Sequence, residues 1–316
     1  MLAAVPAKPD VPVRRQVLSP LRYPGGKRRL VPYIAALLRE NDLQPGLFIE
    51  PFAGGASVAL ELAALGIVKR IALADLDPWV ASFWNTVFYD CDWLCRRVET
   101  IDVRLATWDR LKHTKAQSRR WQALACLFLN RTSFNGALHR SAGPIGGRAQ
   151  TSEYDLACRF PRHRLVRRLR ACEELAKDGK VAWVRCLSAE HAIRDARREA
   201  TEAGETTFFY LDPPFWAKSS HLYRYRFFDF HHEELAEALR WLREPWLLSY
   251  DLADEVVELY EKHDVRRANV ELLYTGARRA GYEELVITNQ SALPSDTKLW
   301  HTKAEWKHRR RATLRT

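Results

Sequence analysis

The sequence predicts an α/β fold built on a mostly parallel sheet. Short apolar segments typical of buried strands alternate with segments whose apolar residues have helical spacing. One strand runs through a glycine-rich turn into a helix (47–57), and the next strand ends in an acid, Asp75. This arrangement is typical of the crevice in which nucleotide-like ligands bind in open sheets. The 316 residues allow one large α/β domain with an insertion, or two domains.

The composition favours a polyanionic partner. The net charge is +11, and eleven Trp with eleven Tyr offer flat rings for base stacking. Frequent use of arginine for other reasons would also give this charge, so composition alone indicates nucleic acid only modestly.

The cysteines and the hydropathy pattern indicate an intracellular protein without a metal. The six cysteines are scattered and form no C-x-x-C pair, so we expect free thiols in a reducing cytoplasm and no zinc site. We find no signal peptide and no apolar run that could span a bilayer. A soluble, intracellular protein is therefore expected.

Ordered structure is expected to begin after a Pro- and Ala-rich arm (1–19). In the segment 21–27 two glycines let the backbone approach a ligand, while Tyr23 adds a ring and Lys27 a positive charge. The segment lacks the spacing and the hydroxyl of a P-loop, so an ATP-binding loop is not predicted. A helix follows at about 30–39.

The glycine turn in 47–57 lets a cofactor lie against the backbone, and the following helix opens near Ser57. The absence of G-x-G-x-x-G spacing argues against NAD. The strand 70–75 ends at Asp75, where a carboxylate can accept hydrogen bonds from ribose hydroxyls. Asp77 is more simply the N-cap of the next helix.

Between residues 91 and 178 the pattern changes to a helical insertion. Helices are expected at 93–112 and 119–129, before a Gly-, Pro- and Ser-rich loop (141–152). The densely basic stretch 159–170 has few acids nearby, so we expect it to contact phosphates rather than form only a solvated helix face.

The α/β pattern resumes with strands at 181–187 and 206–211 and a helix at 190–203 between them. The second strand stops at Asp212, and two prolines prevent its continuation. An acidic acceptor, free carbonyls and the ring of Phe215 then lie at the carboxyl end of a strand. That corner suits a planar base with an exocyclic amine, although an ordinary turn would have the same residues.

The remaining segments complete the sheet. An irregular loop (216–229) with several cations suits closure over a substrate. Helices at 231–242 and 253–262 flank a strand at 246–249. Strands at 265–272 and 284–288 are expected to form an antiparallel pair, joined by 274–282. A basic tail (290–316) is expected to be flexible.

Taken together, the motifs resemble the Dam-type (D12 class) DNA adenine-N6 methyltransferases, in the α-group order. The similar segments are 22–27 (RYPGGK), 50–55 (EPFAGG), 73–75 (LAD), 129–136 (LNRTSFNG), 212–215 (DPPF), 225–235 and 284–289 (ELVITN). The resemblance covers about residues 20–289.

The resemblance implies a Rossmann-like S-adenosylmethionine-dependent methyltransferase fold with a helical DNA-recognition insertion. The catalytic domain would comprise 20–90 and 179–289, and the target-recognition insertion 91–178. The implied catalytic residues are Asp212, Pro213, Pro214 and Phe215. The cofactor would be bound by Tyr23, Lys27, Glu50, Phe52, Gly54, Asp75, Ser188 and Asp212. The expected contacts to double-stranded DNA are Arg131, Phe134, Asn135, His139, Arg140, Lys218 and Arg224.

The implied reaction is methyl transfer to N6 of a flipped-out adenine without a metal. The resemblance implies a cytoplasmic, nucleoid-associated enzyme that acts as a monomer, and an oligomer stays open as an alternative. Acceptance of the amine hydrogens by Asp212 and the Pro213 carbonyl would favour a pyramidal nitrogen, and Phe215 would stack on the base. Catalysis by cysteine, as in C5-cytosine enzymes, is not expected because the sequence has no Pro-Cys.

Three alternatives remain open at this stage. N4-cytosine methylation shares the amine chemistry, but its motif usually begins with Ser where this chain has Asp212. A basic DNA-binding protein with a decayed methyltransferase fold is another class, and an RNA substrate is a third possibility. Phe215 replaces the usual Tyr, and no basic G-x-Y-K-type segment is recognisable in 146–150. The target sequence therefore stays open.

Overall fold

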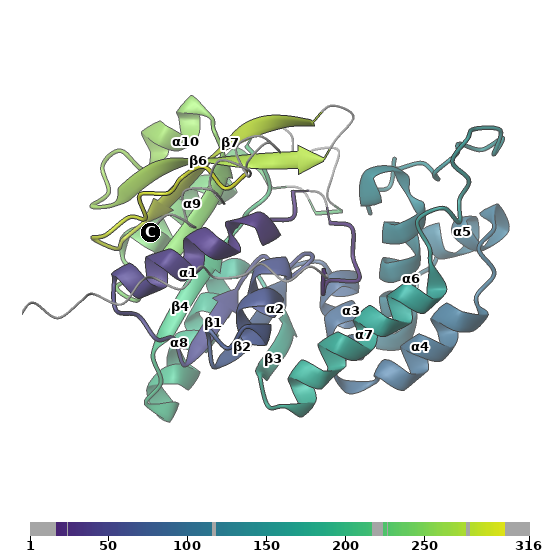
Figure 1. The fold of residues 1–316 in the computed structure, drawn as a ribbon, viewed down its shortest axis with the longest axis horizontal. Coiled ribbons are helices and arrows are strands. Elements are labelled where there is room, and N and C mark those ends of the chain that lie inside the picture. Colours follow the sequence, from purple (N-terminus) through teal and green to yellow (C-terminus); the bar gives the residue numbers. More distant parts are fainter. Residues whose placement is uncertain are drawn as a thin grey trace, which may run out of the picture.

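The structure, a computed structural model, describes residues 17–23, 25–115, 118–216, 224–225, 227–275 and 279–300. Its strands are β1 (Leu47–Glu50), β2 (Arg70–Asp75), β3 (Val181–Cys186), β4 (Thr207–Leu211), β5 (Trp246–Asp251), β6 (Arg266–Thr275) and β7 (Arg279–Thr288). They form one sheet in the order β3-β2-β1-β4-β5-β7-β6 (Figure 1). The first five strands pair in parallel, and β7 lies antiparallel between β5 and β6. The predicted fold class is confirmed.

The helices cover both faces of the sheet. They are α1 (Val31–Glu40), α2 (Ser57–Ala64), α3 (Pro78–Tyr89), α4 (Cys91–Thr100), α5 (Leu105–Lys112), α6 (Arg119–Thr132), α7 (Arg162–Lys177), α8 (Ala189–Ala203), α9 (Asp229–Arg240) and α10 (Asp254–Leu259), with 3₁₀ turns η1 (Arg28–Leu30) and η2 (Phe134–Gly136). Successive strand residues point to opposite faces: Phe48 packs with α1, α2 and α3, whereas Leu47 and Ile49 pack with α8, α9 and α10. The result is a three-layer arrangement.

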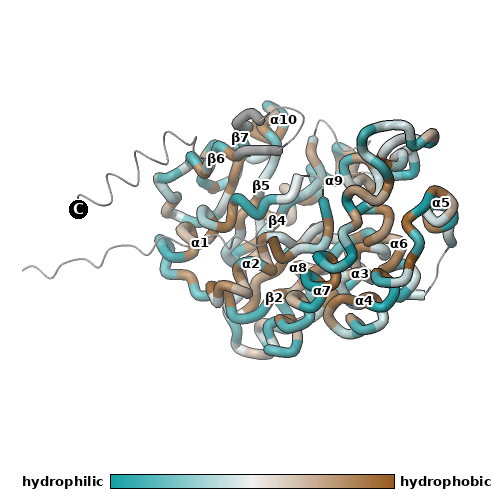
Figure 2. Tube along the Cα trace, turned by 45° about the vertical axis from the view of Figure 1, so that its right-hand side comes forward, coloured by the Kyte–Doolittle hydropathy of each residue, from teal (hydrophilic) through white to brown (hydrophobic). Residues whose placement is uncertain are grey.

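The helices of the predicted insertion (91–178) have no core of their own. Buried side chains of α4, α6 and α7 belong to the same apolar cluster as those of α1, α2 and α3. Figure 1 shows these helices gathered at one side of the sheet, and Figure 2 shows hydrophobic and hydrophilic residues alternating along α7. One continuous core therefore joins the helical part to the sheet.

Two predicted elements differ in length from the observed ones. The helix expected at 93–112 is interrupted between α4 and α5, because Ile101 adopts an extended conformation and is buried there. β-Branched residues such as Ile101 and Val103 also lower helix propensity. The last two strands are longer than expected: their ladder continues to the pair Thr275↔Arg279, so that only 276–278 join them.

The ends of the described chain are more ordered than predicted. Leu18, in the expected N-terminal arm, is 7% exposed and belongs to the core. In the expected tail, the Ala292 N–H donates to Asn41 Oδ1 (3.0 Å) and the Leu299 N–H donates to the Glu271 carbonyl (3.1 Å). These contacts fix the tail up to residue 300 against α1 and β6. Residues 1–16 and 301–316 lie outside the described residues.

Candidate active site

A cavity of about 250 Å³ lies at the carboxyl ends of β1, β2 and β4. The sheet order changes direction between β1 and β4, which is where open α/β sheets bind ligands. The cavity collects side chains from distant parts of the sequence. The expected site residues that line it are Tyr23, Lys27, Glu50, Phe52, Gly54, Asp75, Ser188, Asp212, Pro214 and Arg224.

The glycine turn after β1 is shaped by contacts that require glycine. Gly54 has a φ of +45°, and a Cβ there would lie 2.7 Å from the ring of Tyr23. The Gly54 N–H donates to Asp75 Oδ2 (2.9 Å), and its carbonyl accepts from Trp84 Nε1 (2.8 Å). Hydrogen bonds to Asp75 and Trp84 therefore hold the backbone of the turn, and the Tyr23 ring packs against it.

Asp75 connects this turn to the next one. Its Oδ1 accepts from the Asp77 N–H (2.8 Å) while Oδ2 binds Gly54. Burial, and then the nearby charge of Asp77, raise the pKa of Asp75 to about 7. A carboxylate has further lone pairs, so these bonds leave it able to accept from a ligand hydroxyl. Asp77 accepts from the Trp79 N–H (2.9 Å), which confirms its predicted role as N-cap of α3.

Glu50 is buried below the turn, with 4% of its surface exposed. Its Oε1 accepts from the Ala59 N–H (2.7 Å) and so caps the first turn of α2. Burial raises the pKa of Glu50 to about 8, since the backbone hydrogen bonds offset only part of the lost hydration. Glu50 lines the cavity and at the same time holds α2 in place.

Asp212 lies at the end of β4 and has one oxygen engaged by the protein. Oδ1 accepts from Lys27 Nζ (2.8 Å) and from Ser249 Oγ (2.9 Å). Because the Ser249 proton is used there, the Tyr210 hydroxyl donates to Ser249 Oγ (2.9 Å). Burial raises the pKa of Asp212, and the Lys27 ammonium only partly opposes that rise. The second oxygen of Asp212 has no partner among the described residues.

Lys27 is a buried cation among carboxylates. It is 2% exposed and lies 3.7 Å from Glu284 Oε2 in addition to Asp212. Burial alone would lower the pKa of Lys27, but Asp212 and Glu284 outweigh it, and the pKa is raised. The ammonium lies 4.9 Å from the centre of the Phe215 ring. Lys27 thus links the acid to the aromatic residue of the same motif.

The chain after Asp212 is held rigidly. Pro213 is buried, Pro214 lines the cavity, and Phe215 packs on Gly25, where a Cβ would be 2.9 Å from the ring. The Trp216 N–H donates to Asp251 Oδ1 (3.0 Å), which ties the motif to the end of β5. Because of these contacts, Phe215 stands beside the acid and not in the cavity lining.

The opposite wall is made by Ser188 and by aromatic rings. Ser188 is the N-cap of α8: its hydroxyl accepts from the His191 N–H (3.4 Å) and hydrogen-bonds to His191 Nδ1 (2.7 Å). Phe52 packs edge-to-face on Phe227, with 5.7 Å between ring centres. This wall offers apolar surface and one hydroxyl to a ligand.

The segment 129–136 hydrogen-bonds to the segment around Tyr23, which lines the cavity and is called the cavity-lining segment. Asn130 accepts from the Arg22 N–H (2.6 Å) and donates to the carbonyls of Arg22 (3.3 Å) and Gly136 (2.8 Å). Beyond it the turn presents Phe134, which is 67% exposed, and Asn135, with a φ of +53°. Nearby, Arg140 is exposed, and His139 is half-buried.

The structure places two expected DNA contacts elsewhere. Arg131 is only 7% exposed, and its guanidinium donates to the Arg159 and Pro20 carbonyls, which is a structural position. Arg224 lines the cavity, pairs with Asp77 (2.8 Å) and stacks on Trp79 at 3.8 Å. Lys218 lies outside the described residues. Both Arg131 and Arg224 are therefore engaged within the protein.

Ser249, Tyr210 and Glu284 were not expected in the site. A signal for Ser249 existed, because it lies near the end of the strand next to that of Asp212. Glu284 lies within β7, where the pairing of β7 with β5 begins. Since β7 is antiparallel to β5, Glu284 lies opposite Asp251, at the same edge of the sheet as the end of β5. The position of Glu284 in the site follows only once the direction of β7 is known.

Within the described ranges no helix is long and apolar enough to cross a membrane. The same ranges contain no group of three or more His, Cys, Asp and Glu side chains that could hold a metal ion.

The comparison with known proteins agrees with the geometry. Residues 23–276 match the model of the D12 class N6 adenine-specific DNA methyltransferases, whose reaction is methylation of adenine N6 in DNA. No match was found among curated protein sequences. The matched region includes the glycine turn, Asp75, the segment 129–136 and the Asp212 motif. The chain belongs to the D12 class N6 adenine-specific DNA methyltransferase family.

Proposed function

We propose that the cavity binds S-adenosylmethionine and that Asp212 receives a flipped-out adenine at its edge. Asp212 and Glu284 pair with the ammonium of Lys27, and Glu50 and Asp75 line the same cavity. Such an acidic surrounding complements a cationic sulfonium. The glycine turn with the Tyr23 ring against it leaves a flat approach to the backbone. These residues fit the cofactor that the family uses.

Individual roles follow from position. Asp75 would accept ribose hydroxyls, Ser188 and Phe52 would contact the adenine of the cofactor, and Tyr23, Glu50 and Gly54 would form the wall on the methionine side. The bound cofactor supplies a methyl group on a positively charged sulfur.

The observation that supports the catalytic proposal is that the two carboxylate oxygens of Asp212 differ in their partners. Lys27 and Ser249 hold Oδ1, which leaves the other oxygen for the amine of the substrate. With the Pro213 carbonyl as second acceptor, the two amine hydrogens would be bound and the nitrogen lone pair directed away from them. The rate gain would come mainly from this positioning. On transfer the nitrogen loses one proton, and the raised pKa of Asp212 suits it to receive that proton.

The remaining roles concern DNA. An adenine inside a duplex must leave the stack to reach Asp212, and Phe215 would stack on it. Exposed Phe134, Asn135 and Arg140, with His139 beside them, would contact the duplex. We expect the enzyme to act as a monomer in the cytoplasm, where the DNA of a prokaryotic or infected cell lies.

The test is methyl transfer from labelled cofactor to duplex DNA by wild type and Asp212→Ala. Removal of one preorganised polar contact to a developing charge costs about 10²–10³ in kcat, so the variant should lose at least that much at saturating cofactor. Label should appear in N6-methyladenine. An unchanged rate for Asp212→Ala would refute the role of Asp212, and label in cytosine would refute the target. Sequencing of methylated DNA from an expressing host would give the recognition sequence.

A further inference from the structure

Three segments far apart in the sequence bring five arginines together next to the cavity-lining segment. They are Arg22, Arg131, Arg159, Arg164 and Arg168, and we call them the arginine cluster. Arg131 Nε donates to the Arg159 carbonyl (2.7 Å), and Arg168 NH1 donates to the Ser19 carbonyl (3.2 Å). Arg22 directly precedes Tyr23, which lines the cavity. Backbone carbonyls thus hold the cluster together.

The charges of the cluster are not neutralised. Across the described parts of the chain, none of its members forms an ion pair with a carboxylate. Burial, and then repulsion from the four other members, lower the pKa of Arg131 to about 9. In addition, Arg22 NH1 and Arg168 Nε are buried nitrogens that have no hydrogen-bond partner among the residues that the structure describes. Crowded like charges and unsatisfied donors both destabilise a fold, so this arrangement calls for a ligand.

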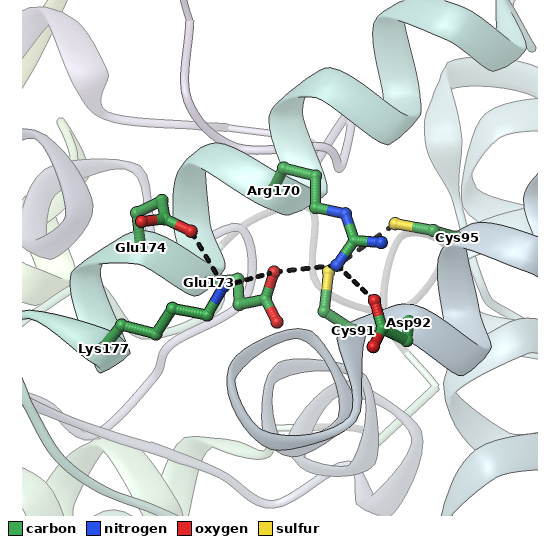
Figure 3. Close-up of polar contacts among 7 residues, drawn as sticks. All are labelled: Cys91, Asp92, Cys95, Arg170, Glu173, Glu174 and Lys177. Atoms are coloured by element: carbon green, nitrogen blue, oxygen red, sulfur yellow. Dashed lines mark hydrogen bonds and ion pairs between the residues drawn. The ribbon is translucent and has the colours of Figure 1, made fainter.

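The other flank of α7 shows an arginine that is neutralised (Figure 3). Arg170 NH1 lies 2.6 Å from Asp92 Oδ1 and 2.9 Å from Glu173 Oε2, and hydrogen bonds to these carboxylates raise the pKa of Arg170. Lys177 pairs with Glu173 and Glu174 on the same flank. The absence of acids at the arginine cluster is therefore particular to one side of the helix.

We propose that the arginine cluster is a phosphate-binding site that holds a phosphodiester group of the DNA strand. The inference rests on the proposed function, since that function brings the DNA strand to the cavity and to the exposed turn at Phe134. Arg159 and Arg164 are exposed and form the outer part, while Arg22 and Arg168 are half-buried behind them. The first turn of α7 has no acid and adds partial positive charge. Guanidinium groups bind phosphate oxygens with paired hydrogen bonds, and the exposed Arg159 and Arg164 would make them, while the bound negative charge would offset the repulsion within the cluster.

The test uses Arg159→Gln, Arg164→Gln and the double variant, with Arg170→Gln as the matched control on the same helix. The affinity for a short DNA duplex is measured over a range of salt concentrations, and each variant is melted without DNA. The slope of log K against log salt should fall by about 0.9 for each phosphate contact that is lost. The control should keep the wild-type slope.

The melting temperature separates ligand binding from a structural role. Among the described residues, neither the Arg159 nor the Arg164 side chain forms a hydrogen bond or ion pair, and each repels Arg131. The double variant should therefore melt at the wild-type temperature or above. An unchanged salt slope, a slope reduced equally in Arg170→Gln, or a lower melting temperature of the double variant would overturn the proposal. A protein that shows the expected slopes but no Asp212-dependent methylation would refute the proposed function and leave this site intact.

Discussion

At the scale of single residues, Asp212 depends on its neighbours. Ser249 and Lys27 share one carboxylate oxygen, and the Tyr210 hydroxyl fixes the direction of the Ser249 proton. A fixed carboxylate loses little orientational freedom when the amine binds. Tyr210 lies on β4, the strand that Asp212 follows, whereas Lys27 and Ser249 come from other parts of the chain.

Ser249→Ala should move the acid limb of the kcat profile to higher pH. The Ser249 hydroxyl binds the charged form of Asp212 and lowers its pKa. Removal of the hydroxyl raises the pKa of Asp212, so the carboxylate becomes protonated at higher pH. The protonated oxygen no longer accepts a hydrogen bond from the amine of the substrate. The measurement is kcat across pH for wild type, Ser249→Ala and Ser249→Thr, where the threonine hydroxyl should restore the profile. A uniform drop in rate with the wild-type profile would contradict this role.

Phe215→Tyr should keep activity, and Phe215→Ala should lose about 10- to 100-fold, the range that corresponds to the loss of one base-stacking ring. The ring lies over Lys27 and packs on Gly25, so a tyrosine would keep both contacts. Single-turnover rates with saturating cofactor and duplex DNA give the comparison. Equal rates for the alanine variant and wild type would remove Phe215 from the site.

At the scale of elements, the end of α6 sets the position of the cavity-lining segment. Asn130, buried in the last turn, binds the backbone of Arg22 and Gly136. A Cβ on Gly136 would be 2.1 Å from the Arg22 carbonyl oxygen, so the two backbones touch. Tyr23 and the turn at Phe134 are therefore parts of one rigid unit.

Asn130→Ala should lower the free energy of unfolding by about 2 kcal/mol or more, because buried backbone groups lose their partners. Cofactor affinity should fall with it, since Tyr23 follows Arg22 directly. Urea denaturation measures the first and calorimetry the second. The exposed Arg140→Ala serves as control and should change stability by no more than about 0.5 kcal/mol. Wild-type cofactor affinity in Asn130→Ala would show that the two segments are independent.

At the scale of the whole molecule, the buried acids at the ends of β1 and β2 make the free energy of unfolding depend on pH. Glu50 has a folded-state pKa of about 8 against an ordinary value of 4.5, and Asp75 about 7 against 3.8. Between these values the folded state binds more protons than the unfolded state. The stability of the ligand-free protein should therefore fall as pH rises through that window.

Glu50→Gln isolates the contribution of one acid. The amide keeps an acceptor for the Ala59 N–H and cannot ionise. Relative to the variant, wild type should lose stability between pH 4.5 and about 8, by an amount on the order of several kcal/mol. Urea unfolding at several pH values gives this difference. A difference that stays constant across pH would show that Glu50 is charged throughout.

The sequence by itself determined the features that depend on local order along the chain. Alternating apolar segments predicted the parallel sheet, and Asp75, Asp77 and Asp212 were found because each directly follows a strand or opens a helix. The glycine turn, with a positive φ at Gly54, was equally local. The family resemblance rested on these segments and is confirmed by the match over residues 23–276.

Only the tertiary structure decided which side chains meet. Lys27 and Asp212 are 185 positions apart, and Ser249 and Glu284 joined them through the order and direction of β4, β5 and β7. Burial likewise gave Arg131 a structural position, while in the described parts of the chain Arg22, Arg159, Arg164 and Arg168 form no ion pair with an acid. A one-dimensional pattern contains composition and periodicity, but the partner that neutralises a charge or holds a carboxylate depends on packing between distant segments.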